Sequence, residues 1–418
     1  MKHTIYLIIG LALNSSLSAA TTEQQVLNHY AVLAHSMYSD SLITATSLSE
    51  AIDKLITNPT EANLGAAKEA WISARHPYQQ TEVYRFGNAI VDEWEGKVNA
   101  WPLDEGLIDY VDASYGDESD ENPYYTANII ANPILKLSGR VIDTTNITKE
   151  ILSAQLHEID EVEANVATGY HAIEFLLWGQ DLNGTGPGAG NRPVTDYDVK
   201  NCTMGNCDRR AAYLKAVTEL LVDDLSWMVE QWSTSGTARK AITEGVLKEN
   251  LATIFTGMGS LSYGELAGER MKLGLILHDP EEEHDCFSDN THWSHFNDVK
   301  GILNVYTGHY TRIDGTIIKG PSLSDLVTEK SPATDSALRA HLLKTLRKMK
   351  LLVESANQGI AYDQLIGENN PKGNASVQAA IDALIAQTHL IEKAVTVLDL
   401  GSIAFEGSES LDEPHKVK

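Results

Sequence analysis

Residues 64–78, LGAAKEAWISARHPY, carry the pattern that decides the fold. Apolar residues follow one another here at steps of three and four: Leu64, Ala67, Trp71, Ala74 and Tyr78. Side chains at that spacing lie on one face of an α-helix. The stretch therefore predicts a helix with a single buried stripe.

The same spacing recurs along most of the chain. Thr22 and Gln25 form a possible capping box for a helix expected over 23–56, which Asn58-Pro59-Thr60 ends. Further stripes predict one long helix through Leu152, Leu156, Ile159, Val162, Val166, Ile173 and Leu177, another through Leu214, Val217, Leu221, Met228 and Trp232, and two late ones at 338–352 and 377–398. Alternating β-branched runs between turns are scarce, so we expect an all-α protein.

The composition fits a large folded protein with an acidic surface. The chain has 418 residues, of which 43% are hydrophobic, so it can bury a sizeable core. It has 32 basic against 58 acidic residues, a net charge of −26. A surface that negative repels phosphate backbones, which argues against nucleic acid as a partner.

The first twenty residues have the pattern of a signal peptide. Lys2 precedes an apolar run at 5–13 that is too short to span a membrane, and small residues at 18–20 predict cleavage after Ala20. No Cys stands at that point to form a lipobox, and no later run of eighteen apolar residues exists. We expect a periplasmic or secreted protein that does not span the membrane.

Loops divide the remaining chain into three parts. Residues 21–280 are expected to form a first helical-bundle half, 281–335 an irregular connecting segment, and 336–418 the helices that complete a second half. The Gly-rich residues 183–193 predict either a flexible connector or a loop that closes over a ligand.

The three cysteines fit an oxidising compartment. Cys202 and Cys207 enclose four residues, which allows a small local disulfide. Half of a zinc site is the alternative, but no second Cys pair exists to complete it. Cys286 would remain as a buried thiol.

His171 and Glu174 are the first candidate metal ligands. They are three residues apart in GYHAIEFLLWG (169–179), so on a helix they project from one face, and Gly169 allows close approach of another segment. An imidazole and a carboxylate so placed can bind one metal ion. A structural hydrogen-bonded pair is the alternative that this spacing leaves open.

A second polar group lies on the first quoted helix and just beyond it. Arg75, Gln79 and Glu82 step by four and three residues along one predicted helix flank beside the buried stripe. Partly buried Arg and Glu need partners. They either pair with each other, or Glu82 is a third ligand to an ion held by His171 and Glu174.

Three further segments place polar residues among apolar ones. Residues 99–106, NAWPLDEG, predict a loop fixed by Trp101. Residues 281–292, EEEHDCFSDNTH, favour a solvated turn, with metal binding as the alternative. Residues 264–271, GELAGERM, have small residues four apart, which permits tight contact between helices.

Together these segments resemble the imelysin-like family, which is classed with peptidase family M75, and its iron-regulated protein A branch. The family signature Gly-x-His-x-x-Glu falls on Gly169, His171 and Glu174. The matching stretches, which span most of the chain, are SARHPYQQTEVYRFG (73–87), NAWPLDEGLIDYV (99–111), GYHAIEFLLWGQDL (169–182), GPGAGNRPVTDY (186–197), GMGSLSYGELAGERM (257–271) and EEHDCFSDNTH (282–292). The family pattern has Ser where this chain has Asp285.

The resemblance implies two helical-bundle halves around a central cleft, export, and a part in bacterial iron acquisition. We expect iron, or an iron-bearing small ligand, to be bound by His171, Glu174 and Glu82. Components of outer-membrane iron uptake are candidate partners. Other residues expected to contact the ligand are Arg75, Tyr78, Trp101, Asp104, Glu105, Glu269 and Arg270.

The resemblance also implies an alternative, a zinc-dependent peptidase of the insulin-cleaving type. His171 and Glu174 would then be ligands, and Glu82 or Glu105 the base that activates a metal-bound water. The motif does not match the known zinc-protease patterns, because Phe175 stands where His-x-x-Glu-His needs its second His.

Overall fold

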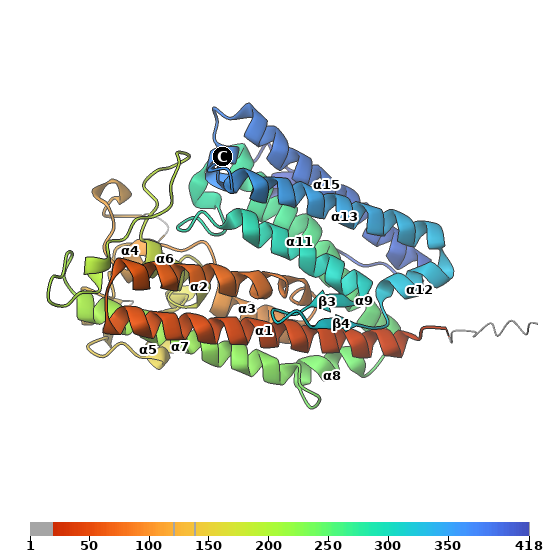
Figure 1. The fold of residues 1–418 in the computed structure, drawn as a ribbon, viewed down its shortest axis with the longest axis horizontal. Coiled ribbons are helices and arrows are strands. Elements are labelled where there is room, and N and C mark those ends of the chain that lie inside the picture. The colour runs from red at the N-terminus through yellow and green to blue at the C-terminus, as the bar shows by residue number, and fades with distance from the viewer. Residues whose placement is uncertain (1–19, 120–121, 138, 418) are drawn as a thin grey trace, which may run out of the picture.

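Figure 1 shows the computed structural model, which describes residues 20–119, 122–137 and 139–417. The predicted signal peptide falls on residues 1–19, which lie outside the described residues, and on Ala20. The described chain is built mainly of helices, with two short antiparallel hairpins, so the all-α prediction is confirmed.

The first group of elements runs from residue 23 to residue 243. Its long helices are α1 (Glu23–Thr57), α2 (Glu61–Gln79), α3 (Ala89–Asn99), α6 (Gly169–Trp178) and α7 (Cys207–Gln231). Its shorter elements are η1 (Glu82–Tyr84), α4 (Glu105–Ile108), η2 (Ala113–Tyr115), β1 (Ile134–Leu137), β2 (Arg140–Asp143), α5 (Lys149–Ile151), η3 (Leu152–Leu156), η4 (Ile159–Glu161), η5 (Val194–Asp196) and α8 (Thr237–Thr243).

The second group covers the rest of the chain. Its long elements are α9 (Leu247–Ser260), the π-helical η6 (Leu261–Leu273), α11 (Thr291–Thr307), α13 (Pro332–Ala356) and α15 (Pro371–Val397). Its shorter elements are α10 (Gly274–Leu277), η7 (Pro280–Glu282), β3 (His309–Thr311), β4 (Ile317–Lys319), α12 (Leu323–Lys330), α14 (Tyr362–Ile366) and α16 (Glu409–Asp412).

The long helices form two layers that α11 joins. In one layer α1 packs against α2 and α7, and in the other α13 packs against α15 (Figure 1). Helix α11 packs against both α13 and α2. It approaches α2 closely at Gly301, where a Cβ atom would lie 2.4 Å from the backbone oxygen of Gln80. Only glycine fits at that crossing.

The helix predictions near the N-terminus and C-terminus are confirmed. The capping box at Thr22 and Gln25 is present, and α1 ends at Thr57. The stripe of α2 is buried throughout, as are most of the apolar residues predicted for α7, α13 and α15. Apolar periodicity identifies these helices because each buries one face.

The prediction of one long helix from Leu152 to Leu177 is wrong. The chain leaves the helical path after η3, takes left-handed backbone at Glu158 and Asp160, and re-enters a helix at α6. The buried amide of Asn165 donates to the backbone oxygen of Ile159 at 3.0 Å. Polar contacts therefore hold a turn here, and the apolar residues, all buried except the half-buried Val162, do not belong to one helix.

The prediction of an irregular segment over 281–335 is wrong in large part. This range contains α11, the β3–β4 hairpin and α12. Helix α11 is buried on most of its surface, and inward-facing residues such as His295 and Asp298 are polar. It has no single apolar stripe, so periodicity could not reveal it. The division into two halves stays a prediction.

The cysteine predictions have mixed outcomes. Cys202 and Cys207 form a disulfide with a Cα–Cα distance of 5.9 Å, so the local bridge is confirmed and the half zinc site is wrong. Cys286 is a free thiol but is only half-buried.

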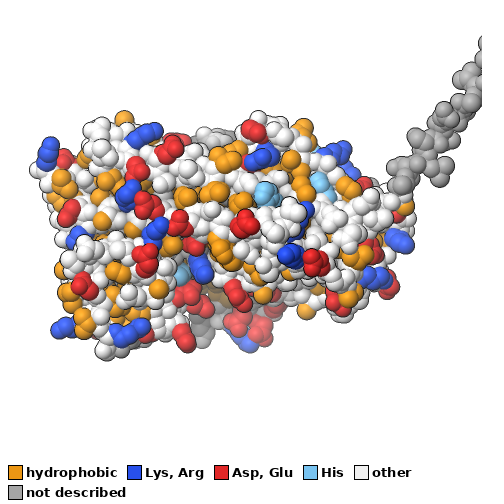
Figure 2. Space-filling view, turned by 90° about the horizontal axis from the view of Figure 1, so that it is seen from below, with side chains coloured by type: hydrophobic (Ala, Val, Ile, Leu, Met, Phe, Trp, Pro, Cys, Tyr) orange, Lys and Arg blue, Asp and Glu red, His pale blue; other side chains and the backbone are white. Residues whose placement is uncertain are grey.

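The surface is mixed in character. Figure 2 shows acidic, basic and apolar side chains interspersed over the face seen from below, with no single large area of one kind. Among the described residues, no helix is both long enough and apolar enough to cross a membrane.

A buried ion cluster fixes the start of α7 against the loop after α4. Asp109, which is 2% exposed, accepts hydrogen bonds from Arg210 at 2.6 and 3.0 Å and from Arg192 at 2.8 Å. Burial opposes ionisation, but the two guanidinium groups hold the pKa of Asp109 below its ordinary value. Its contribution to stability is therefore present above that ordinary value of 3.8 and is lost as the pH falls below it.

We expect Asp109→Asn to lower the free energy of unfolding at pH 7 by about 3 kcal/mol, because it leaves two buried guanidinium groups short of charge. Denaturant titration measures this. The matched control is Asp53→Asn, whose exposed pair with Lys215 should contribute under about 1 kcal/mol. The difference between wild type and Asp109→Asn should shrink below pH 4; a difference independent of pH would contradict this account.

Candidate metal centre

Gly169 positions the helix that carries the first two candidate ligands. Its φ is +82°, and a Cβ atom there would lie 2.5 Å from the backbone oxygen of Val98 in α3. Next to it, the side chain of Trp71 in α2 donates to the backbone oxygen of Tyr170 at 2.9 Å. The first turn of α6 is thus wedged between α2 and α3, as the predicted close approach at Gly169 requires.

His171 and Glu174 meet on α6 as their spacing predicts. His171 Nδ1 lies 3.0 Å from Glu174 Oε2, and both side chains are buried. The other carboxylate oxygen, Oε1, accepts hydrogen bonds from the backbone and hydroxyl of Ser288 at 2.9 and 2.6 Å. Glu174 thereby holds the imidazole in one orientation.

His284 and Asp285 complete the centre. Among the described residues, His171, His284 and Asp285 form the one group whose nitrogen and oxygen donors suit a metal, all within 4.8 Å of one another. The rings of His171 and His284 are 4.8 Å apart. The Nε2 atom of His171 is buried and has no hydrogen-bond partner in the described part of the chain. Two nitrogen donors and one carboxylate therefore converge on one place.

Asp285 also forms a buried ion pair with Arg75. Arg75 Nη2 lies 2.6 Å from Asp285 Oδ1, and Arg75 Nη1 donates to Asn99 at 2.6 Å. On its other oxygen Asp285 accepts from Asn290 at 2.9 Å and from the Ser294 hydroxyl. The loop that carries His284 is in this way fastened to α2, α3 and α11.

The local electrostatics keep the imidazoles uncharged. Burial, and then the nearby Arg75, lower the pKa of His171 to about 3, and burial lowers the pKa of His284 well below its ordinary value. Burial alone would raise the pKa of Asp285, but Arg75 holds it at about 2. At neutral pH the centre therefore offers two neutral nitrogen donors and one carboxylate. Such groups are ready to coordinate a metal.

Glu82 and Arg270 form a second buried ion cluster beside the centre. Arg270 contacts Glu82 at 2.7 Å, Glu265 at 2.6 Å and Asp298 at 3.4 Å. Helix α2 ends at Gln79, so the predicted helix flank does not continue to Glu82. The structure brings Glu82 to Arg270 and places it outside the group of metal donors.

The buried and half-buried charges around the centre do not balance. Linked ion pairs and hydrogen bonds join three guanidinium groups and seven carboxyl groups. The members are Arg75, Arg85 and Arg270, and Glu82, Asp92, Glu95, Glu174, Glu265, Asp285 and Asp298. Burial raises the pKa of Glu174 and of Asp298 well above the ordinary value, so protons take part of the excess negative charge. A bound cation would neutralise the same part of the excess negative charge.

The residues predicted to contact a ligand separate into two sets. Trp101, Asp104 and Glu105 line a pocket of about 400 Å³, and the Trp101 ring lies 6.0 Å from that of His284. Tyr78 is in the apolar core against Tyr170, with their rings 4.8 Å apart. Neither Tyr78 nor Glu269 lines this pocket, and Glu269 is exposed on η6, so the ligand contacts predicted for these two residues stay a prediction.

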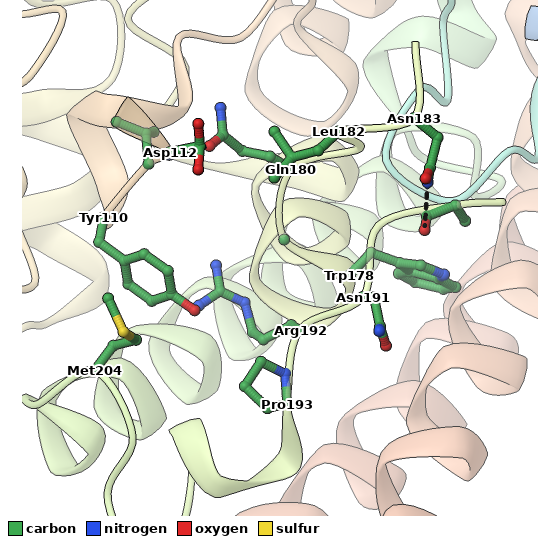
Figure 3. Close-up of a pocket in the computed structure, with 13 residues that line it drawn as sticks. Tyr110, Asp112, Trp178, Gln180, Leu182, Asn183, Asn191, Arg192, Pro193 and Met204 are labelled. Carbon is green, nitrogen blue, oxygen red and sulfur yellow. Dashed lines mark hydrogen bonds between the residues drawn. The ribbon is translucent and has the colours of Figure 1, made fainter. Parts of the chain in front are cut away.

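A separate pocket of about 310 Å³ lies at the end of α6. Figure 3 shows Tyr110, Arg192 and Met204 on one side of it and Leu182 and Asn183 on the other. The Gly-rich loop forms part of its wall, and within this loop Asn183 donates to the backbone oxygen of Gly188 at 2.6 Å. None of the predicted ligand residues lines this pocket.

Sequence reasoning gave His284 and Asp285 the wrong environment. The acidic segment around them favoured a solvated turn, but Glu283, His284 and Asp285 are all at most 2% exposed. The available signal was the apolar pair Cys286-Phe287 inside the acidic run, since Phe287 packs against Phe175 of α6 at 5.3 Å. That contact draws the segment inward.

The chain has relatives among known proteins. A family model described as Imelysin matches residues 34–391. Iron-regulated protein A of Synechococcus elongatus is 23% identical over 360 residues, which cover 85% of this chain and 80% of that protein. A crystal structure from Parabacteroides distasonis, of a protein assigned as an iron-regulated protein A precursor, has a TM-score of 0.64 at 18% identity. It covers 91% of this chain and 97% of that chain, so the two share a fold.

The position of α6 should depend on Gly169. We expect Gly169→Ala to lower the free energy of unfolding by roughly 1–3 kcal/mol or more, because it adds a strained φ and a clash with Val98. Gly65→Ala is the control, because Gly65 lies in α2 with open space around it and should gain roughly 0.5–1 kcal/mol. Equal effects of the two substitutions in a denaturant titration would refute this role of Gly169.

Proposed function

The chain belongs to the imelysin family, and on this premise we propose that it binds ferrous iron through His171, His284 and Asp285. Two observations carry the proposal: the buried Nε2 atom of His171 has no hydrogen-bond partner among the described residues, and His171 forms one group of possible donors with His284 and Asp285. A buried polar atom without a partner is costly unless a ligand satisfies it.

The donor set supports a borderline divalent metal. Two imidazoles and one carboxylate are the ligands that non-haem ferrous sites use, and zinc accepts the same set. The printed name of the Synechococcus relative, iron-regulated protein A, favours iron. Two donors bound about 2.1 Å from one ion are at most about 4.2 Å apart, so a pair at the 4.8 Å limit of this group would have to close by about 0.6 Å or more.

Glu174 acts in this proposal as a positioning residue. It occupies His171 Nδ1 and leaves Nε2 as the donor atom, an arrangement in which a carboxylate orients a metal-bound imidazole. Glu82 is assigned to Arg270 and not to the ion. A role in bacterial iron acquisition, with export to the periplasm, is part of the same proposal and is supported by the family and by the named relative.

Iron titration tests the centre. We expect wild-type protein to bind one equivalent of ferrous iron in anaerobic calorimetry, and His171→Ala/Glu174→Ala to bind none at this site. The chain supplies a matched control in His389 and Glu392, an exposed pair at the same spacing with Nδ1 and Oε2 3.3 Å apart. His389→Ala/Glu392→Ala should bind iron as wild type does. Equal binding by both double variants would reject the site.

A second comparison separates ligand from positioning residue. We expect Glu174→Gln to weaken iron binding by about 10–100-fold, the usual effect of removing an orienting carboxylate. His284→Ala should abolish binding, because it removes a donor atom. If Glu174→Gln abolishes binding while His284→Ala does not, Glu174 is the ligand and His284 is not.

The zinc-peptidase alternative requires access that the described conformation does not provide. His171, His284 and Asp285 are 1%, 2% and 0% exposed, so an extended peptide cannot reach them. We expect no chelator-sensitive cleavage of an unfolded protein substrate after zinc loading. Cleavage that a chelator abolishes and that Glu174→Ala lacks would favour the peptidase.

A further inference from the structure

The pocket at the C-terminal end of α6 contains none of the donors assigned to iron. Its volume of about 310 Å³ lies at the lower end of the range for small-molecule sites. Its wall is formed by the segment after α4, the end of α6, the Gly-rich loop and the disulfide-closed loop that carries Met204 (Figure 3). Separate segments of the chain therefore enclose a space that a small organic molecule can fill.

The Gly-rich loop, which forms one wall of this pocket, is fixed to the end of α6. The backbone N–H of Arg192 donates to the backbone oxygen of Trp178 at 2.7 Å, and that of Gly190 donates to Phe287 at 2.9 Å. A Cβ atom at Gly190 would lie 2.5 Å from the backbone oxygen of Gly179, so only glycine allows this close approach. The wall is therefore preformed, which lowers the entropic cost of binding a ligand.

Two aromatic side chains of the wall are also held in place. The ring centre of Tyr110 lies 5.1 Å from the guanidinium carbon of Arg192 and 5.2 Å from that of Arg210. The ring of Trp178 packs edge to face against Trp71, with ring centres 5.4 Å apart. Both rings therefore present a fixed apolar surface to the pocket.

The apolar lining continues to the protein surface. Leu182 and Met204 lie on opposite sides of the pocket (Figure 3) and are 63% and 51% exposed. An occupant that contacts both side chains would remove this apolar surface from water, which favours binding.

The polar groups of the pocket favour a neutral occupant over an ion. Arg192 lines the pocket, but its charge is already paired with Asp109 at 2.8 Å and with Asp196 at 3.0 Å. The exposed Asp112 carries the one carboxylate among the lining residues. Three further lining residues carry amides, which both donate and accept hydrogen bonds as hydroxyl groups do: Gln180, Asn183 and Asn191.

Two of the polar side chains lack partners within the described part of the chain. Arg192 is 4% exposed and extends toward Tyr110 in the wall (Figure 3), and its buried Nε–H has no hydrogen-bond acceptor there. The side-chain amide of Asn191 is exposed and forms no hydrogen bond to the described residues. A buried donor without an acceptor is costly, which points to an oxygen atom that a ligand supplies.

A sugar matches this combination of groups. Its hydroxyl groups donate and accept hydrogen bonds around the edge of the ring, and its C–H groups form apolar faces that pack against aromatic rings. We propose that this pocket binds a small neutral sugar, whose ring packs against Tyr110 and Trp178 and whose oxygens accept hydrogen bonds from Arg192 and Asn191. The site shares no residue with the proposed iron centre and does not depend on it.

Saturation-transfer NMR with single sugars tests the proposal on the whole protein. The probes are glucose, galactose, mannose and N-acetylglucosamine, and we expect at least one of them to bind. Glucuronate should bind more weakly than glucose, because Asp112 repels its carboxylate. Cyclohexanol, a ring with a single hydroxyl group, should not displace the bound sugar.

Two substitutions of exposed residues locate the binding in this pocket. Asn191→Ala should raise the dissociation constant about three- to tenfold, the effect of losing one or two neutral hydrogen bonds. Met204→Ser should raise it about threefold, because it removes an apolar contact. Arg192 is not substituted, because its loss would leave the buried Asp109 short of a partner. The melting temperatures of both variants should equal that of wild type.

The matched control is Asn201→Ala. Asn201 is an exposed asparagine near Met204 in the sequence, but it does not line the pocket, so this variant should bind the sugar as wild type does. Equal weakening by Asn191→Ala and Asn201→Ala, or unchanged binding in both pocket variants, would overturn the proposal. Binding of none of the four sugars, glucuronate binding as tight as that of glucose, or displacement of the sugar by cyclohexanol would also overturn it.

Discussion

Charged groups that lose contact with water need partners, and the contact between the two helix layers depends on this constraint. Arg75 and Arg270 are 0% and 3% exposed. They take their partners from α3, η1, η6, α11 and the loop before α11. Because each guanidinium joins segments far apart in the chain, the ion pairs select one arrangement of the layers. Loss of one partner would leave a buried charge, which costs more than the lost contact itself.

The parts of the fold that sequence could predict are those where a helix buries one face. Helix α2 has a regular stripe from Leu64 to Tyr78, and α1 has a capping box that fixes its start. Helix α11 could not be predicted from apolar periodicity, because it joins both layers and is buried on most sides, with His295 and Asp298 pointing inward. The break between Leu156 and Gly169 could not be predicted either, because apolar residues are buried there although the backbone does not continue as one helix.

The same distinction explains the site. His171 and Glu174 meet because they are three residues apart on one helix, which is a local property. His284 and Asp285 lie more than one hundred residues further along the chain, in an acidic stretch of sequence that favours a solvated turn. Their burial follows from the packing of Phe287 on Phe175 and from the ion pair with Arg75, neither of which periodicity contains. The prediction of Glu82 as a third ligand depends on a helix flank that continues past Gln79, where α2 ends.

One short segment therefore separates two environments of opposite chemistry. On His284 and Asp285 it presents a neutral imidazole and a carboxylate already held by Arg75, so that site combines nitrogen with oxygen donors and tolerates a borderline metal. On Glu283, one residue earlier, it presents a carboxylate that no guanidinium reaches, in a pocket of further carboxylates. The excess of acidic residues in the composition is therefore not only a surface property, since part of it is buried in the interior.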